Sequence, residues 1–90
     1  MDIRNAQLFL HLASSLNFAR TSEQMYVSPS TLSRVIQRME EELNVELFQR
    51  DNRSVRLTLA GQKVQAFAKS YLEQWHQLQT QGLLPVLLLY

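Results

Sequence analysis

Residues 27–38, V-S-P-S-T-L-S-R-V-I-Q-R, constrain the fold of this chain more than any other stretch, because they carry the signals of a helix start. Ser28 can accept a hydrogen bond from the free backbone N–H groups of a first helical turn, and Pro29 suits the first helical position. Val27, before the cap, can pack onto Leu32 one turn later. The sequence therefore predicts a helix that begins at Pro29.

This helix is predicted to have one apolar and one polar face. At about 100° per residue, Leu32, Ile36, Met39 and Leu43 form one narrow stripe that can pack against a core. The other side carries mostly hydroxyl, amide and guanidinium groups, from Ser30, Ser33, Arg34, Gln37, Arg38 and Glu41. One face is expected to pack, and the other offers hydrogen-bond donors.

Two shorter helices are predicted before it. Apolar residues recur at three- and four-residue steps from about Asn5 to Leu16, which is the spacing of an amphipathic helix. Asn17 can cap a second helix from Phe18 to Tyr26, which turns almost at once into the helix that begins at Pro29. The order is helix, tight turn, helix.

The periodicity changes after Asn44, a residue that tolerates the left-handed conformation of a helix end. The runs L-F-Q-R and S-V-R-L look like short strands, joined by the turn-forming residues Asp51 and Asn52 and by Arg53. They predict a small hairpin with Arg53 at or near its tip.

The last and longest helix is predicted from about Leu59 to Gln81, with Thr58 as its N-cap and with Gly82 and Pro85 ending it. Its apolar residues follow the a and d spacing of a heptad, with others beside them. Three short helices cannot cover so long an apolar face, so part of it is expected to meet the same helix of a second copy. The predicted dimer interface consists of Val64, Phe67, Ala68, Tyr71, Leu72, Trp75 and Leu78.

The predicted fold class is therefore mainly α. We expect a winged helix-turn-helix with three short helices and a β-hairpin wing over residues 1–58, a linker and dimerisation helix over residues 59–81, and an unassigned tail over residues 82–90. A chain of 90 residues can bury one modest core. No second folded domain is expected within it.

Composition bears on where the chain works. It contains no cysteine, which excludes disulfides and thiolate metal sites. The start, M-D-I-R-N-A-Q, lacks the basic and apolar regions of a secretory signal, and the run L-L-P-V-L-L-L-Y is shorter than the roughly 20 residues that a bilayer span needs. We expect a cytoplasmic, nucleoid-associated protein with no membrane contact.

The residues of catalytic and metal sites are not arranged for such chemistry. His11 and His76 have no spaced carboxylate or thiol partners, and we interpret both as structural or solvated. Three adjacent acids, Glu40 to Glu42, point in different directions on a helix, so a solvated helix end that pairs with Arg38 or holds the hairpin through Arg50 is favoured over a cation site. Neither an enzyme nor a bound cofactor is predicted.

A formal net charge of +1 indicates no partner by itself, so the placement of the cations matters more. A helix-turn-helix presents the first turns of its second helix to the DNA major groove, where Ser, Thr and Arg can contact phosphates and bases. An arginine at a hairpin tip can enter the adjacent minor groove. These features favour DNA binding; the alternative for these residues is a solvated surface face.

Several motifs stand in one order along the chain: L-F-L-H-L-A-S-S-L-N-F, then V-S-P-S-T-L-S-R-V-I-Q-R-M-E-E-E-L, L-F-Q-R and L-T-L-A-G. Together they resemble the DNA-binding domain of LysR-type transcriptional regulators over residues 1 to about 80. The pieces S-P-S-T-L-S-R and R-D-N-R are most similar to those of regulators of branched-chain amino-acid synthesis. Thr21 and Ser22 replace the family's usual small alanines, which predicts slightly looser packing of the second helix, and Leu59 replaces a common acidic residue.

The resemblance implies a dimer that binds double-stranded DNA at an interrupted palindrome, with the helix from Leu59 antiparallel to its partner. It implies that Arg53 enters the minor groove, and we expect Arg34 to contact a base and Arg38 a phosphate. The family's effector-binding domain is expected to be absent, so a small-molecule effector would act only through that domain. The residues implied at the major groove are Ser28, Pro29, Ser30, Thr31, Ser33 and Arg34.

A second class of function remains open from the sequence. The long apolar face of the last helix could itself be the functional surface, which would make the chain a protein-interaction or dimerisation module with the three-helix part as its scaffold.

Overall fold

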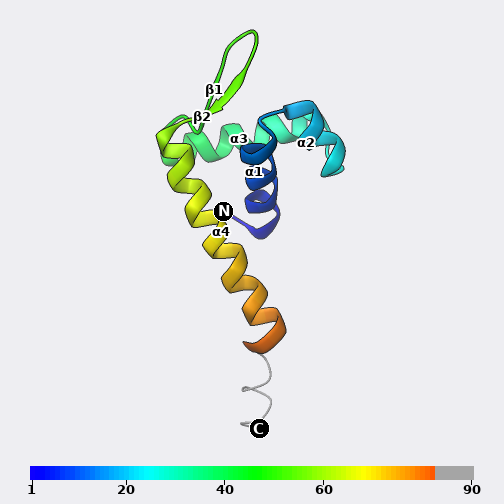
Figure 1. Ribbon diagram of the computed structural model, residues 1–90, viewed down its shortest axis with the longest axis vertical. Helices are drawn as coiled ribbons and strands as arrows, with labels where there is room; N and C mark the ends of the chain where they lie inside the picture. The colour runs from blue at the N-terminus through cyan, green and yellow to red at the C-terminus, as the bar shows by residue number, and fades with distance from the viewer. Residues whose placement is uncertain (83–90) are drawn as a thin grey trace.

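The computed structural model describes residues 1–82 and is mainly helical (Figure 1). The expected order of three short helices, a hairpin and a long helix is confirmed. The predicted stop at Pro85 and most of the predicted tail lie outside the described residues. The elements are α1 (Ile3–Ser15), α2 (Phe18–Gln24), α3 (Pro29–Leu43), β1 (Phe48–Arg50), β2 (Val55–Leu57), α4 (Leu59–Gln77) and a π-helical turn η1 (Leu78–Gly82).

Each α-helix begins at a side-chain cap that accepts a hydrogen bond from a backbone N–H three residues later. The predicted caps Asn17, Ser28 and Thr58 are confirmed, with donor–acceptor distances of 2.9, 3.1 and 2.9 Å. The cap of α1 is Asp2, which the sequence analysis did not identify. This helix therefore begins at Ile3, before the predicted start at Asn5.

The helix ends use the left-handed backbone region where the chain must turn sharply. Asn44 has φ of 54°, as predicted for the end of α3. Leu16 and Tyr26 also adopt positive φ, 53° and 57°, after α1 and α2. Since Tyr26 takes part in the turn, α2 ends at Gln24 and is shorter than predicted.

The core lies where α1 packs against α2, α3 and α4 (Figure 1). Of the four residues in the predicted stripe of α3, Leu32, Ile36 and Met39 are buried, but Leu43 is 50% exposed. The prediction for Leu43 is wrong because this residue ends α3 beside an open groove against α4. The buried apolar residues are Ala6, Leu8, Phe9, Leu12, Ala13, Leu32, Ile36, Met39, Leu47, Phe48 and Ala68.

The two hydroxyl residues of α2 are accommodated inside the fold. Thr21 is fully buried, and its Oγ1 lies 2.7 Å from both His11 Nδ1 and Ser15 Oγ. The Ser22 hydroxyl donates to the Phe18 carbonyl at 2.8 Å. Each hydroxyl has a partner, so neither carries the cost of an unpaired buried group. His11 is half-buried in these contacts and is structural, as interpreted from the sequence.

Strands β1 and β2 form an antiparallel hairpin, which we call the wing. Phe48 pairs with Leu57 at its base, and Arg50 pairs with Val55 next to its loop. The wing projects from the helical body at the end where α3 and the start of α4 lie, and α4 runs from there in the opposite direction (Figure 1). This arrangement confirms the winged helix-turn-helix and leaves the wing loop, residues 51–54, at the far tip.

Candidate nucleic-acid interface

The first turns of α3 present small polar side chains to solvent. Ser28, Ser30 and Thr31 are exposed, and their hydroxyls form a cluster: Ser28 Oγ donates to Thr31 Oγ1 at 2.8 Å and lies 3.1 Å from Ser30 Oγ. The first turn of α3 contains no acidic residue. Since the N-terminus of a helix carries partial positive charge, this end of α3 suits a close anionic partner such as a phosphate.

Two arginines extend the same surface along α3. Arg34 and Arg38 are exposed and four residues apart, so they lie on one side of the helix. Pro29 is exposed as well, whereas Ser33 is half-buried. Six of the seven residues predicted on this helix are thus accessible to a partner, and Ser33 is accessible only in part.

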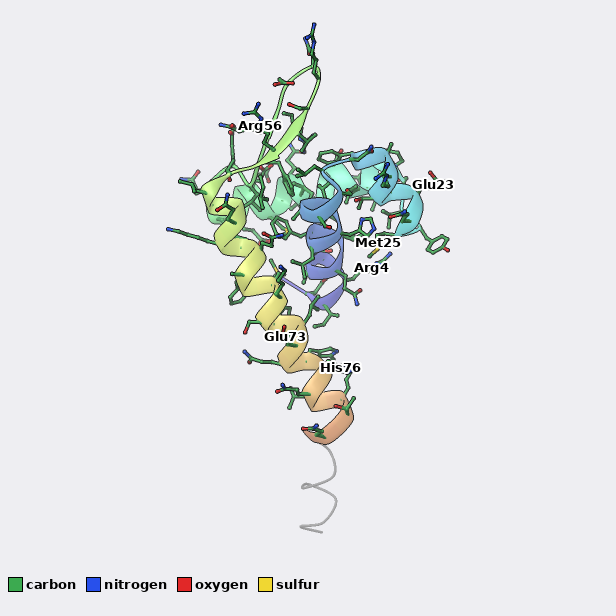
Figure 2. The ribbon with its side chains drawn as sticks, in the orientation of Figure 1. Arg4, Glu23, Met25, Arg56, Glu73 and His76 are labelled. Atoms are coloured by element: carbon green, nitrogen blue, oxygen red, sulfur yellow. The ribbon has the colours of Figure 1, made fainter. Side chains whose placement is uncertain are left out.

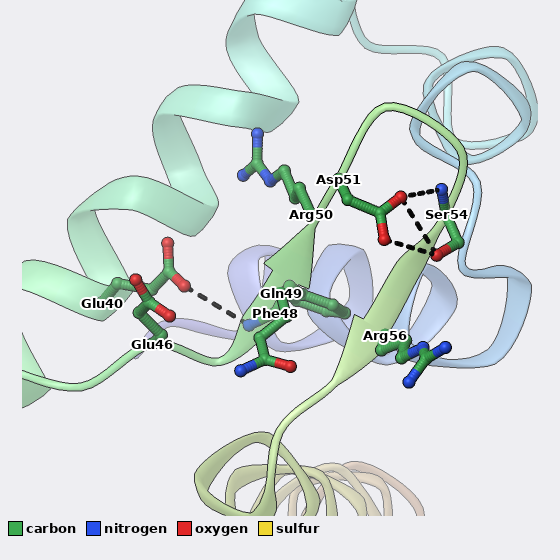
Figure 3. A pocket seen from close by; sticks show the side chains of 8 residues that line it. All are labelled: Glu40, Glu46, Phe48, Gln49, Arg50, Asp51, Ser54 and Arg56. Carbon is green, nitrogen blue, oxygen red and sulfur yellow. Dashed lines mark hydrogen bonds between the residues drawn. The ribbon is translucent and has the colours of Figure 1, made fainter.

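The tip of the wing is shaped by one carboxylate. Asp51 Oδ1 accepts from the backbone N–H groups of Arg53 and Ser54, both at 2.8 Å, and Figure 3 shows the bond to Ser54. The Asp51 N–H donates to the Ser54 carbonyl at 3.0 Å. The hydrogen bond from the Arg53 N–H, and to a smaller extent the one from the Ser54 N–H, lowers the pKa of Asp51 below its ordinary value, because both bonds favour the charged carboxylate. Arg53 is exposed in this ordered turn, as predicted.

The wing carries two further arginines that the sequence analysis did not include in the site. Arg56 is exposed on β2 and pairs in register with Gln49 (Figures 2 and 3). Arg50 is exposed at the end of β1, with its Cζ 4.2 Å from the centroid of the Phe18 ring. Their presence on a hairpin with Arg53 was the available signal, since three cations on one small element form a basic surface.

Glu40 does not hold the wing through Arg50, which was one of the two predicted roles for the acids at the end of α3. Its Oε2 instead accepts from the backbone N–H of Leu47 at 2.8 Å. It also accepts from the N–H of Phe48 at 3.4 Å, which is the bond drawn in Figure 3. These two N–H groups lie at the start of β1, and strand β2 does not accept hydrogen bonds from them. The Glu40 carboxylate accepts these bonds in its place, which matters because a backbone donor left unpaired is costly.

An open hollow of about 570 Å³ lies between α3 and the wing (Figure 3). Acidic and basic side chains line it together, among them Glu46, Asp51 and Arg56. Within residues 1–82, no three His, Cys, Asp or Glu side chains come together in a way that could hold a metal ion.

The residues predicted at the dimer interface divide into two groups. Ala68 is fully buried in the chain's own core, and Val64, Tyr71 and Leu72 are half-buried against that core. Part of the apolar face of α4 therefore packs against α1 of the same chain. The exposed group is Phe67, Trp75 and Leu78, at 62%, 42% and 58%.

The exposed apolar surface continues into a groove of about 370 Å³ between the end of α3 and α4. The rings of Phe67 and Tyr71 stack beside it, with centroids 6.2 Å apart. The groove is lined by Met1, Met39, Glu42, Leu43, Lys63, Val64 and Phe67. Of the helices in residues 1–82, none combines the length and the apolar character needed to cross a membrane.

Comparison with known proteins explains this combination of a polar helix start, an arginine wing and a long helix. Residues 3–62 match the family model described as bacterial regulatory helix-turn-helix protein, lysR family. The chain belongs to the LysR family. That match includes all three short helices, the wing and the first turn of α4.

Curated LysR-family relatives include the HTH-type transcriptional activator IlvY of Salmonella typhimurium, which is 55% identical over 78 residues. IlvY of Haemophilus influenzae is 48% identical over 81 residues. The matches cover 87% and 90% of this chain, but only 26% and 28% of those relatives. The chain therefore spans about a quarter of the length of the curated relatives it matches.

Solved structures of LysR-family proteins have the same fold. The CbnR DNA-binding domain in its DNA complex superposes with a TM-score of 0.88 at 27% identity, covering 96% of this chain and 99% of that one. The BenM domain in complex with catB site 1 DNA gives 0.82 at 28% identity, covering 89% of each chain. The fold of this chain is thus that of LysR-family domains solved with DNA bound.

Proposed function

We propose that this chain is the sequence-specific DNA-binding part of a bacterial LysR-type transcriptional regulator, and that it works in the cytoplasm at the nucleoid. The observation that carries the proposal is the exposed polar start of α3, with Arg34 and Arg38 on one side of the helix, together with the wing that carries Arg53. The likeness to the CbnR and BenM domains in their DNA complexes supports it.

In the proposed complex, the start of α3 enters the major groove. Small hydroxyl side chains allow the helix backbone to come close to the DNA, after which the longer arginines can reach beyond them. Arg34 contacts a base and Arg38 a phosphate, while Arg53 enters the adjacent minor groove, whose negative potential attracts it. The residues proposed at the major groove are Ser28, Pro29, Ser30, Thr31, Ser33 and Arg34.

The proposed DNA-binding form is a homodimer joined through antiparallel α4 helices. The exposed apolar side chains Phe67, Trp75 and Leu78, and the groove beside Leu43, support a second copy as the partner of this face. Two copies related by a two-fold axis would read an interrupted palindrome, since a symmetric dimer presents two recognition helices. A small-molecule effector would act only through a domain that this chain does not contain.

The likeness to IlvY proteins extends the proposal to the class of regulated genes. The chain is 55% identical to an IlvY activator over most of its length. Together with the resemblance of S-P-S-T-L-S-R and R-D-N-R to regulators of branched-chain amino-acid synthesis, this identity supports control of such genes. The curated relatives are named as transcriptional regulators, so the proposed function includes no catalytic step.

A salt titration tests DNA binding. Binding of the chain is measured to a duplex with an interrupted palindrome and to a scrambled duplex of equal length. We expect the affinity for both duplexes to fall steeply with rising salt, because phosphate contacts release counterions. We also expect the affinity for the palindrome to exceed that for the scrambled duplex by about 10³-fold or more. Absence of binding at low salt would contradict the proposal.

Substitution of the two arginines of α3 separates their proposed roles. Arg34→Ala is expected to cost roughly 1–3 kcal/mol on the palindrome and to relax specificity at one position of each half-site. Arg38→Ala, its matched control one turn further along the helix, is expected to weaken binding to all duplexes alike. The affinity of each variant is measured for the palindrome and for random DNA. If Arg34→Ala loses the same affinity on both kinds of DNA, Arg34 does not read a base.

A protein-interaction module is the second candidate function, favoured by the exposed apolar residues of α4. It differs from the first proposal in one respect that the same titration measures. A chain that forms a stable dimer but does not bind either duplex, even at low salt, would act through α4 alone.

A further inference from the structure

Three contacts connect the wing to the helices, and the first comes from α3. The Glu40 carboxylate accepts from the N–H groups of Leu47 and Phe48, at 2.8 and 3.4 Å, where the chain enters β1. Figure 3 shows the bond to Phe48. Glu40 lies on the same helix as Arg34 and Arg38, so the helix proposed to read DNA also holds the root of the wing.

The second contact comes from α2 and holds the other end of β1. The Arg50 guanidinium lies over the ring of Phe18, 4.2 Å from its centroid, which is the geometry of a cation–π interaction. Phe18 in turn meets Phe48 edge-on at 6.4 Å between centroids, and Phe48 packs on Phe9 of α1 at 5.5 Å. The end of β1 is thereby joined to the start of α2 and to the core.

The third contact fixes the chain where it leaves the wing. Thr58 Oγ1 donates to the Glu46 carbonyl at 2.6 Å, and the Thr58 N–H donates to the Leu47 carbonyl at 3.0 Å. This contact joins the wing to the start of α4, and like the Glu40 contact it lies at the base of the wing, at Leu47. Arg50 is therefore the anchor nearest to the tip.

Beyond Arg50 the wing supports only itself. Among the described residues, the hydrogen bonds of the loop 51–54 run between Asp51, Arg53 and Ser54. The strands pair over only three residues each, and a two-stranded hairpin of that size is marginally stable by itself. The direction in which the tip points must therefore come from the contacts on β1.

We propose that Glu40 and Arg50 are positioning residues for DNA binding, which together hold the wing at a fixed angle to α3 so that Arg53 and α3 engage adjacent grooves at once. The inference rests on the proposed function, because it assumes that Arg53 contacts DNA. In this proposal Arg50 acts through the Phe18 ring, on which its guanidinium lies, and not through a phosphate contact.

A double-substitution cycle tests this role. Arg53→Ala is expected to weaken binding to the palindrome about tenfold. Arg50→Ala is expected to cause nearly the same loss, because the wing no longer presents Arg53, and the double variant is expected to be no weaker than either single variant within about twofold. Losses that multiply to about a hundredfold in the double variant would show that Arg50 makes its own DNA contact and would overturn the proposal.

Arg56→Ala is the matched control for charge. It removes an exposed arginine from the same hairpin without touching the Phe18 ring. Its effect is expected to multiply with that of Arg53→Ala, since the two residues act independently. If the Arg56 and Arg50 variants gave the same pattern with Arg53→Ala, the loss would reflect wing charge alone, and Arg50 would have no positioning role.

Phe18 provides a variant that leaves every charge in place. Phe18→Leu is expected to reproduce the loss of Arg50→Ala, and Phe18→Tyr, which keeps the ring, to restore binding. A direct phosphate contact by Arg50 predicts the reverse, with Phe18→Leu binding like the unsubstituted chain. Thermal melts show whether Phe18→Leu is folded, and the Arg50 and Arg53 cycle remains decisive if it is not.

Glu40 is tested by the comparison of two variants. Glu40→Gln keeps an oxygen acceptor for the N–H groups of Leu47 and Phe48 and is expected to bind the palindrome within about twofold of the unsubstituted chain, whereas Glu40→Ala is expected to lose about tenfold. Equal binding by a folded Glu40→Ala variant would remove Glu40 from the proposal. The unsubstituted chain is measured first, and if it does not bind the palindrome, the proposed function fails. If it binds, and the Glu40→Ala and Arg50→Ala variants bind as tightly as it does, the positioning role fails.

Discussion

At the scale of single residues, Asp51 shows how one carboxylate shapes the part of the wing that is proposed to meet DNA. Its Oδ1 accepts hydrogen bonds from two backbone N–H groups while the residue remains exposed. An exposed acid at the tip of a DNA-contacting hairpin would repel phosphates, so its presence needs a reason. The reason is geometric, because the same two bonds fix the turn from which Arg53 extends.

The pH response of the wing tip follows from these bonds. They lower the pKa of Asp51 from its ordinary value of 3.8 in the folded chain, the Arg53 N–H more than the Ser54 N–H. A carboxyl with a lower pKa in the folded state stabilises that state above the unfolded pKa, and this contribution is lost as pH falls through the folded pKa. The turn should therefore stay intact from neutral pH down to below pH 3.8 and then loosen.

Solution NMR can measure this response. The carboxyl carbon of Asp51 is expected to titrate below 3.8, and the amide protons of Arg53 and Ser54 are expected to shift with it. Asp51→Asn is the matched control, because it keeps an oxygen acceptor and has no proton to gain; its two amides should not move over the same pH range. An Asp51 that titrates at or above 3.8 would contradict stabilisation of its charged form by these two hydrogen bonds.

At the scale of elements, the wing and α4 meet at Gly61, in the first turn of α4. A Cβ at this position would lie 2.3 Å from the Leu47 carbonyl oxygen and 2.5 Å from Leu57 Cδ1. The carbonyl belongs to the backbone and cannot rotate away. We expect Gly61→Ala to lower the free energy of unfolding by about 2–3 kcal/mol, as overpacking does in other cores, and urea denaturation followed by circular dichroism measures it.

The neighbouring residue provides the control for this substitution. Gln62→Ala also places alanine in the first turns of α4, but at an exposed position, so it is expected to change the free energy of unfolding by at most about 0.5 kcal/mol. A Gly61→Ala variant as stable as Gln62→Ala would mean that α4 does not approach the wing as closely as the distances at Gly61 require.

The elements themselves were predictable from the sequence because their signals are local. Asn17, Ser28 and Thr58 act on N–H groups three residues away, and the turn at Asp51 is likewise internal to the wing. Asp2 carries the same kind of signal and was missed, since the apolar spacing of α1 becomes clear only after the helix has begun.

Contacts between elements were not predictable in the same way. The burial of Ala68 depends on how α1 packs on α4, and the exposure of Leu43 depends on the groove left between the end of α3 and α4. No periodicity within a single helix encodes either. Glu40 binds backbone N–H groups, which every residue possesses, so no side-chain pattern indicated its partner. The Arg50 and Phe18 pair also joins distant parts of the chain. The sequence thus predicted which residues of α3 and the wing are exposed better than which contacts hold these elements together.

At the scale of the whole molecule, α4 serves two surfaces. Its half-buried residues pack on α1 inside the chain, while Phe67, Trp75 and Leu78 remain exposed on the same broad apolar face. An apolar strip that a chain cannot cover alone is typical of an interaction surface. A dimer would cover this strip without disturbing the core of either chain, because the residues needed for the fold are already buried.

Substitution of the exposed strip tests the dimer and its consequence for DNA binding together. Phe67→Glu with Trp75→Glu is expected to give a folded monomer in sedimentation, because neither side chain belongs to the core and paired chains would have to bury four carboxylates. Ala66→Glu with His76→Glu also introduces two carboxylates, at exposed positions on the opposite side of α4, and should leave the dimer intact. The monomer is expected to bind a single half-site as the unsubstituted chain does but to lose about a hundredfold or more on the palindrome, since the second half-site no longer benefits from linkage. A Phe67→Glu and Trp75→Glu variant that still sediments as a dimer would place the interface elsewhere on the chain.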